Sequence, residues 1–298
     1  MSKPGSLVAT FVAGQGASLS EATPERALRE AGLAASRLEW LAPGVAADAC
    51  FDGDEIAATR ARLQGALAGE PVDVIVQPRD GRRKKLLVAD MDSTMIEQEC
   101  IDELAGVAGI RDRISAITER AMAGELDFEQ ALKQRVALLK GVTLDDVAAI
   151  VARITLTPGA RALVQTMRAN GAYTALVTGG FTQFTDPVAA RIGFDETFAN
   201  RLEIADRALT GVVFDPVQGR AGKRAALAAL RERLSLPREA TLAIGDGAND
   251  LDMLREAGLG VAFHAKPKVA EAADARIDCA DLTALLYAQG YRQEDFAA

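Results

Sequence analysis

Short apolar segments alternate with helix-length segments from residue 86 to residue 263, and this alternation constrains the fold more than any other feature. Amphipathic stretches of about 10–15 residues lie between the apolar segments, which is the pattern of βαβ units. The sequence therefore predicts an α/β fold built on a parallel sheet. The predicted strands are LLVA (86–89), YTALV (173–177), TLAIG (241–245) and, as the last one, LGVAF (259–263).

Residues 1–80 have a different pattern. Residues 7–13 and 72–76 are apolar and predict strands within a β-α-β-α-β order. This order predicts a small N-terminal α+β domain at 1–80, followed by a larger domain at 81–298. The basic segment PRDGRRKK (78–85) is predicted to be a solvated linker between them.

Polar residues follow three of the predicted strands. Ligands of parallel sheets bind beyond the carboxyl ends of the strands, so these residues are expected to share one site. The helical segments at about 101–156 come between the first two strands and predict a cap inserted over that site. The polar residues are Asp90 and Asp92 after the first strand, Thr178, Gly179 and Gly180 after the second, and Asp246, Asn249 and Asp250 after the third.

Asp90 and Asp92 place two carboxylates and a backbone carbonyl in a small volume. Oxygen ligands of this kind suit Mg²⁺, and Asp246 offers a further carboxylate, so Mg²⁺ is the expected cofactor. An aspartate can also act as a nucleophile that forms an acyl phosphate, while a second carboxylate serves as general acid and base. The pair therefore suits phosphoryl transfer.

The other strand-end residues match the needs of a phosphate group. Thr178 offers a hydroxyl, and Gly179 offers a backbone N–H near the start of a predicted helix. Lys223 opens another predicted helix and can offset the charge of a carboxylate and a phosphate. Asn249 and Asp250 can orient ligands or Lys223.

Composition excludes several classes of protein. A net charge of −8 argues against general nucleic-acid binding. The single histidine, His264, excludes a multi-histidine metal site, and three widely spaced cysteines predict neither disulfides nor zinc. Apolar stretches stay well short of the ~18 residues that a membrane span needs. The N-terminus has no signal-peptide pattern, so we expect a cytoplasmic protein that binds no membrane.

The motif order resembles the haloacid dehalogenase superfamily of phosphatases across residues 86–285. The motifs are DMDST, TGGF, a helix-opening lysine and GDGANDLDM. The resemblance implies a Rossmann-like sheet with a helical cap, a Mg²⁺ cofactor, and a nucleophilic first aspartate followed by a general acid/base. These roles fall on Asp90 as nucleophile and Asp92 as acid/base, on Thr178 and Lys223 at the phosphate, and on Asp90, Asp92 and Asp246 at the metal.

Within that superfamily, DSTMIEQECIDELA and AGELDFEQALKQRVALLKG resemble the phosphoserine phosphatases. The resemblance implies that Glu99 binds the ammonium group of O-phosphoserine and that Arg135 binds its carboxylate, and opposite charges suit both contacts. Met122 and Phe128 match cap residues that exclude water. Thr178 replaces the expected serine and keeps the hydroxyl. The implied reaction is the last step of serine synthesis, through an aspartyl-phosphate.

Three alternatives remain open at this stage. A related small-metabolite phosphatase, or a phosphoserine:homoserine phosphotransferase, would use the same chemistry. A signalling receiver domain also phosphorylates an aspartate, although Asp92 and the long insertion argue against it. Residues 1–80 resemble a ferredoxin-like, amino-acid-binding regulatory domain, which would make the chain a sensor. They could equally serve packing or dimerisation, which leaves a homodimer open.

Overall fold

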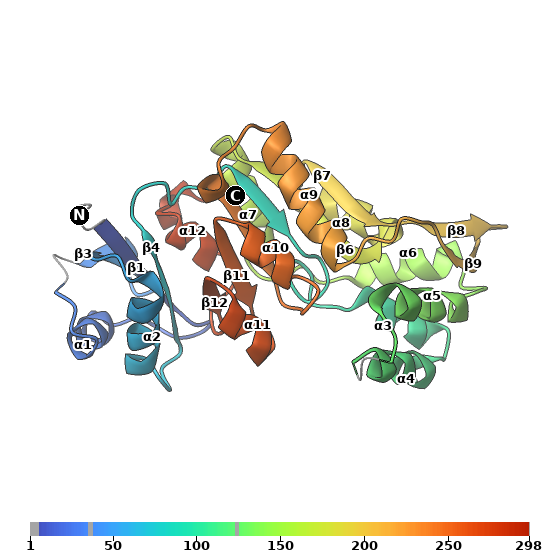
Figure 1. Cartoon of the computed structure of the whole chain (residues 1–298), viewed down its shortest axis with the longest axis horizontal. Coiled ribbons are helices and arrows are strands. Elements are labelled where there is room, and N and C mark those ends of the chain that lie inside the picture. The colour runs from blue at the N-terminus through green and yellow to red at the C-terminus, as the bar shows by residue number, and fades with distance from the viewer. Residues whose placement is uncertain (1–5, 35–37, 123–124, 298) are drawn as a thin grey trace.

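A six-stranded parallel sheet lies at the centre of the protein, which confirms the predicted α/β fold (Figure 1). The structure is a computed structural model that describes residues 6–34, 38–122 and 125–297. The strand order is β12-β11-β10-β5-β6-β7, and every neighbouring pair is parallel. The strands are β5 (Leu86–Ala89), β6 (Tyr173–Phe181), β7 (Glu196–Asn200), β10 (Thr241–Gly245), β11 (Leu259–Phe263) and β12 (Ala275–Ile277).

Helices cover both faces of this sheet. They are α7 (Ala160–Ala169), α8 (Thr182–Ile192), α9 (Arg220–Arg233), α10 (Leu251–Glu256), α11 (Pro267–Ala272) and α12 (Ala284–Ala288), with short 3-10 turns at Arg238–Ala240 and Gln293–Asp295. Leu87 packs with α7, α8 and α12, whereas Val88 packs with α9, α10 and α11. Burial on both faces explains why β5 is an uninterrupted apolar run.

The segment between β5 and β6 forms the predicted helical cap. Its helices are α3 (Cys100–Val107), α4 (Arg111–Met122), α5 (Phe128–Leu138) and α6 (Leu144–Arg153). Asp127 and Thr143 start α5 and α6 with capping boxes, in which side chains satisfy the first backbone N–H groups of each helix. An antiparallel hairpin, β8 (Leu202–Ala205) and β9 (Ala208–Val213), packs beside α5.

The N-terminal region is a four-stranded antiparallel sheet in the order β2-β3-β1-β4. Its elements are β1 (Ser6–Ala13), α1 (Ala22–Glu30), β2 (Leu38–Ala42), β3 (Ala46–Asp52), α2 (Ile56–Ala66) and β4 (Val72–Pro78). The predicted β-α-β-α-β order is wrong at one point. It has one strand between the two helices, whereas the structure has two, β2 and β3. Phe11 faces a core with α1 and α2, whereas Val12 and Ile75 face a second core that includes α12.

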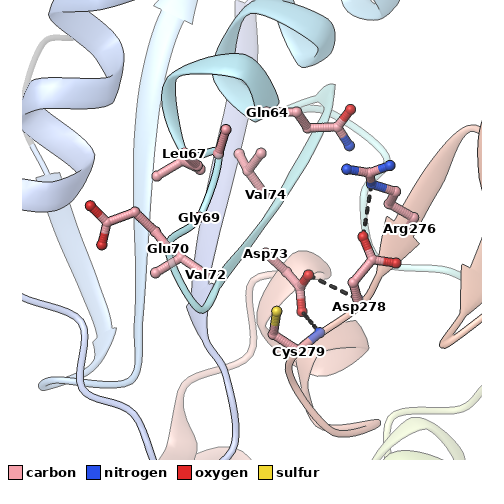
Figure 2. A pocket seen from close by; sticks show the side chains of 11 residues that line it. Gln64, Leu67, Gly69, Glu70, Val72, Asp73, Val74, Arg276, Asp278 and Cys279 are labelled. Carbon is pink, nitrogen blue, oxygen red and sulfur yellow. Dashed lines mark hydrogen bonds and ion pairs between the residues drawn. The ribbon is translucent and has the colours of Figure 1, made fainter.

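Asp73 on β4 joins the two sheets where their edges meet. Its carboxylate accepts the backbone N–H groups of Asp278, Cys279 and Ala280 at 2.9, 3.0 and 2.7 Å. Figure 2 shows this carboxylate directed at the segment after β12, beside a cavity of about 130 Å³ and the 2.9 Å ion pair of Arg276 with Asp278. Hydrogen bonds to a buried charge contribute about 1.5–3 kcal/mol each. The N-terminal sheet is therefore fixed to the larger one.

The basic linker is not simply solvated, and that prediction is wrong for two of its residues. Arg82 forms a 2.6 Å ion pair with Asp48, which is only 2% exposed. The Lys84 ammonium donates to the carbonyls of Gly81 at 3.3 Å and Glu239 at 2.9 Å. Burial lowers the pKa of Lys84. Arg82 therefore reaches the N-terminal sheet, whereas Lys84 packs against the turn before β10 of the larger sheet.

The sheet also extends one strand beyond the predicted last strand. β12 has only three residues, and a run this short leaves no periodic signal in a sequence. Among the helices that the structure describes, none is long and apolar enough to cross a membrane.

Candidate active site

The carboxyl ends of β5, β6 and β10 open into one cavity of about 350 Å³ beneath the cap. Asp90 lies on its floor, and Lys223 and Asp250 are fully buried behind Asp90. The three strand-end motifs therefore come together, although they are up to about 160 residues apart in the chain. The predicted residues that line the cavity are Asp90, Asp92, Glu99, Phe128, Arg135, Thr178, Gly179, Asp246 and Asn249.

Lys223 links two buried carboxylates. Its ammonium lies 2.6 Å from Asp90 Oδ1 and 2.6 Å from Asp250 Oδ1, and its side chain has no exposed surface. Burial by itself lowers the pKa of Lys223, but the two carboxylates outweigh burial and hold that pKa above its ordinary value. Burial raises the pKa of Asp90, the Asp250 charge adds to the rise, and Lys223 opposes it. Lys223 is thus a fixed positive charge beside Asp90.

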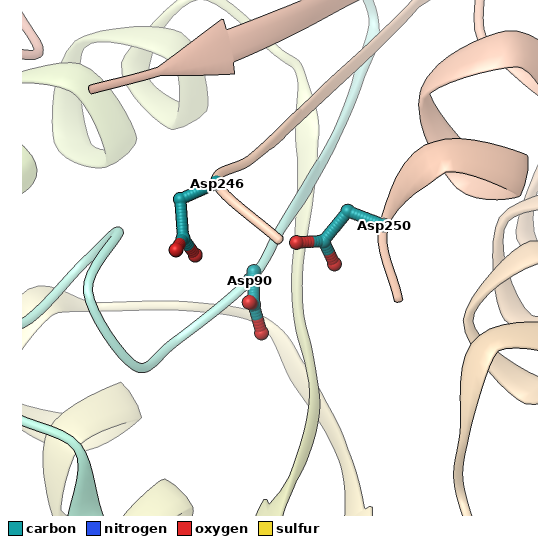
Figure 3. Close-up of side chains that lie close together, drawn as sticks. All are labelled: Asp90, Asp246 and Asp250. Carbon is teal, nitrogen blue, oxygen red and sulfur yellow. The ribbon is translucent and has the colours of Figure 1, made fainter. Parts of the chain in front are cut away.

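The oxygens of Asp90, Asp246 and Asp250 lie within 4.8 Å of one another and can hold a divalent cation (Figure 3). Both oxygens of Asp250 already accept hydrogen bonds, from Lys223 at 2.6 Å and from the Gly247 N–H at 3.0 Å. Asp90 and Asp246 are therefore the better ligands. Burial raises the pKa of Asp246 to about 6, and the Asp250 charge adds to this rise. A cation would relieve this repulsion, so the all-oxygen donor set fits a hard metal ion.

Asp92 is not one of the clustered carboxylates, although the sequence suggested it as a metal residue. Its Oδ1 atom is buried and has no hydrogen-bond partner within the described part of the chain. Burial raises the pKa of Asp92 to about 7, the Glu99 charge adds to the rise, and a hydrogen bond from Cys100 opposes it. A carboxyl group with a pKa near neutrality can both give and take a proton at physiological pH.

The carboxyl end of β6 presents donors to the cavity. The Thr178 hydroxyl oxygen accepts the Gly180 N–H at 2.9 Å, which leaves its own proton to donate to an anion. A Cβ atom on Gly180 would lie 3.3 Å from Asp92 Oδ2 and 3.2 Å from Met91 Cε. The end of β6 therefore lies directly against the acid/base candidate.

Glu99 and Arg135 reach the cavity from the cap side. Glu99 precedes α3 and accepts the Ser93 hydroxyl at 2.8 Å, and burial raises its pKa. Arg135, in the last turn of α5, is half-buried, and burial lowers its pKa while Asp102 and Glu99 oppose the change. In the described part of the chain, no carboxylate pairs with the Arg135 guanidinium within 4 Å. It is therefore available to an anionic ligand.

The sequence analysis missed two residues at this cavity. Lys266 lines it at the end of β11, a fourth strand end that the same rule could have identified. Thr94 donates its hydroxyl to Asp246 Oδ1 at 3.3 Å and is fully buried. Phe128 lines the cavity as predicted, whereas the side chain of Met122 lies outside the described residues.

Charged groups at strand ends beneath an inserted cap define an enzyme with a Rossmann-like sheet and a cap. The chain belongs to the haloacid dehalogenase-like hydrolase family, whose model matches residues 87–255. That match spans all three strand-end motifs.

The similar proteins extend this relationship to the N-terminal region. A phosphoserine phosphatase from Streptomyces coelicolor is 42% identical over 285 residues, which cover 94% of this chain and 70% of the relative. The structure of a haloacid dehalogenase family hydrolase from Salmonella enterica serovar Typhi matches with a TM-score of 0.86 and 31% identity, over 97% of this chain and 99% of that one. A probable phosphoserine phosphatase from Vibrio cholerae matches with a TM-score of 0.78 and 34% identity, over 98% and 90%.

Proposed function

We propose that the chain is a Mg²⁺-dependent phosphatase that hydrolyses O-phospho-L-serine to L-serine and phosphate. The observation that carries the proposal is the pair of opposite charges, Glu99 and Arg135, in a cavity whose floor holds Asp90. Such a cavity complements a small molecule that carries an ammonium, a carboxylate and a phosphate. Relatives named as phosphoserine phosphatases support the same substrate.

In the first step, an oxygen of Asp90 attacks phosphorus and the bond from phosphorus to the seryl oxygen breaks. Lys223 holds the other Asp90 oxygen, and the Thr178 hydroxyl donates to a phosphoryl oxygen. Asp92, with a pKa of about 7, gives its proton to the departing seryl oxygen. Serine leaves, and the phosphoryl group stays on Asp90.

In the second step, Asp92 takes a proton from water, which attacks the phosphorus of the aspartyl-phosphate. The bond from phosphorus to the Asp90 oxygen breaks, and phosphate and the free carboxylate form. Mg²⁺, held by Asp90 and Asp246, would neutralise phosphoryl oxygens and reduce repulsion between the phosphate and the carboxylates. A cap over the cavity excludes bulk water from the phosphoenzyme.

Substrate analogues test the assignment directly. We expect phosphoserine to be hydrolysed far faster than phosphoethanolamine, which lacks the carboxylate, or 3-phosphoglycerate, which lacks the ammonium. Arg135→Ala should lower kcat/KM for phosphoserine by about 10²-fold, because a buried charged contact is lost. The same variant should leave kcat/KM for phosphoethanolamine within a few-fold of the unaltered chain.

The matched control is Arg113→Ala, which removes an exposed arginine from α4 of the same cap. It should leave both substrates unaffected. Equal losses on phosphoserine and phosphoethanolamine in Arg135→Ala would remove Arg135 from the carboxylate role. Formation of phosphohomoserine when homoserine is added would identify phosphotransfer in place of hydrolysis. A cytoplasmic location and a homodimer stay predictions from the sequence.

A further inference from the structure

The ring of Phe128 lies against the backbone of two segments next to catalytic groups, the carboxyl end of β6 and the residue before α9. A Cβ atom on Gly219 would lie 2.8 Å from Phe128 Cδ1 and 2.9 Å from Cε1, and a Cβ atom on Gly179 would lie 3.3 Å from Cζ. Real Cβ atoms do not approach a ring carbon below about 3 Å, because repulsion rises steeply. Only a glycine at position 219 therefore leaves room for the ring in this position.

Backbone conformation does not explain the glycine at 219. Its φ of −127° and ψ of −157° are extended values that any residue adopts. The requirement therefore comes from the ring of Phe128, which belongs to the cap. Gly219 in turn precedes α9, and its carbonyl accepts the Lys223 N–H at 2.9 Å. The ring thus contacts the start of the helix that carries Lys223.

A buried asparagine fixes the end of β6 and the segment before α9 to each other. Asn200, 2% exposed at the end of β7, donates to the carbonyls of Gly179 at 2.8 Å and Gln218 at 3.1 Å. Its Oδ1 atom accepts the Gln218 N–H at 2.7 Å. Because one buried side chain makes all three bonds, it holds in place the surface that Phe128 meets. We call this surface, Gly179 with Gly219, the glycine seat.

Phe128 and Arg135 share helix α5, and Phe128 is its first residue. The position of the ring therefore sets the position of the guanidinium that faces the cavity. Phe128 is still 36% exposed, so a ring pushed off the seat can move toward solvent. Such a movement would carry the start of α5 away from Thr178 and Arg135 away from the floor.

We propose that Gly219 is a positioning residue for the cap: with Gly179 it forms the seat on which Phe128 rests, and this contact sets the closed position of Arg135 over the substrate. The proposal rests on the proposed function and deepens it, since it assigns part of the substrate selectivity to a residue that does not touch the substrate. Gly219→Ala fills the seat with one methyl group and leaves every charged group in place.

The test is a double-mutant cycle of Gly219→Ala and Phe128→Ala, assayed with phosphoserine and phosphoethanolamine. Gly219→Ala should lower kcat/KM for phosphoserine by about 10-fold, which is less than the roughly 10²-fold that a full 1 Å misplacement of a catalytic or binding group can cost. The loss on phosphoethanolamine, which has no carboxylate for Arg135, should be smaller. In the Phe128→Ala background, adding Gly219→Ala should change neither value, because the methyl group then meets no ring.

Gly65→Ala is the matched control, since a Cβ atom on this α2 glycine meets no atom within 4 Å. It should keep the activity of the unaltered chain. The proposal would be overturned if Gly219→Ala left kcat/KM unchanged. It would also be overturned if Gly219→Ala lowered kcat/KM by the same factor in the unaltered chain and in the Phe128→Ala variant. If the unaltered chain hydrolyses both substrates equally, the substrate assignment fails instead. The double-mutant cycle can then be measured on phosphoethanolamine alone. The absence of coupling between Gly219→Ala and Phe128→Ala would still refute the contact between Phe128 and the glycine seat.

Discussion

Replacing Lys223 by methionine should strongly destabilise the fold, and the structure gives the magnitude. The ammonium forms two ion pairs of 2.6 Å with Asp90 and Asp250, and none of the three side chains is more than 5% exposed. Removing one partner of a buried ion pair typically costs about 3–5 kcal/mol, because the remaining charge is left buried. With a slope near 3 kcal/mol per molar urea for a chain of this size, the unfolding midpoint should fall by about 1–1.7 M.

The measurement is urea unfolding at pH 7.5 in metal-free buffer, followed by circular dichroism. Arg224→Met on the same helix is the control, because its 3.0 Å pair with Glu256 involves an arginine that is 60% exposed. An exposed pair contributes about 0–1 kcal/mol, so its midpoint should barely move. Adding Asp250→Asn to Lys223→Met should restore part of the stability, since it removes one of the two stranded charges.

The loss should also depend on pH in one direction. Without the ammonium, burial and repulsion raise the folded pKa of Asp90 further above its unfolded value. A folded state that binds protons more tightly than the unfolded state gains stability as pH falls. The gap between Lys223→Met and the unaltered chain should therefore narrow from pH 7.5 to pH 5.5. A Lys223→Met variant with an unchanged midpoint, or a gap that widens on acidification, would refute this reasoning.

Three further predictions follow from the geometry. Asp90→Asn should abolish turnover and the acid-stable phosphoenzyme label together, and retention of either by the folded variant would exclude Asp90 as nucleophile. Because Asp92, with a pKa of about 7, must be protonated in the first step and ionised in the second, kcat should peak near pH 7. Asp92→Asn should lower kcat by about 10²–10⁴-fold and flatten that profile; an unchanged profile would exclude Asp92. Asp73→Ala leaves three backbone N–H groups without their acceptor, at a cost of about 1–3 kcal/mol each. The N-terminal sheet should therefore unfold in a separate transition in calorimetry. A single transition at an unchanged temperature would contradict the role of Asp73 at the interface.

Much of this architecture could be predicted from the sequence because its signals are local. The apolar run before Asp90 identifies a doubly covered strand, and the strand-end rule places Thr178 and Asp246 beside it. Helix caps such as Asp127 are equally local. The fold class and the strand-end residues can therefore be predicted without knowing which distant segments contact one another.

The remaining features depend on contacts between distant segments. Lys84 is buried partly because Glu239, more than 150 residues away, lies in the turn before β10, the strand next to β5. Asn200 looks like an ordinary strand-end residue until its bonds to Gly179 and Gln218 are known. The roles of Glu99 and Arg135 came from family resemblance, since charged helix residues alone do not reveal what they face. Tertiary packing, which local patterns do not encode, decides each of these cases.

The position of α12 has a consequence for how the protein emerges from the ribosome. One face of the first sheet, around Val12 and Ile75, is covered by this helix, and Gln77 on β4 donates to the Ala288 carbonyl 211 residues later. At about 5–20 residues per second, translation of that interval takes roughly 10–40 s. For this time the nascent N-terminal sheet presents an apolar face that nothing made so far can cover. Chains truncated before α12 should therefore depend on chaperones, even though they contain every catalytic residue assigned above.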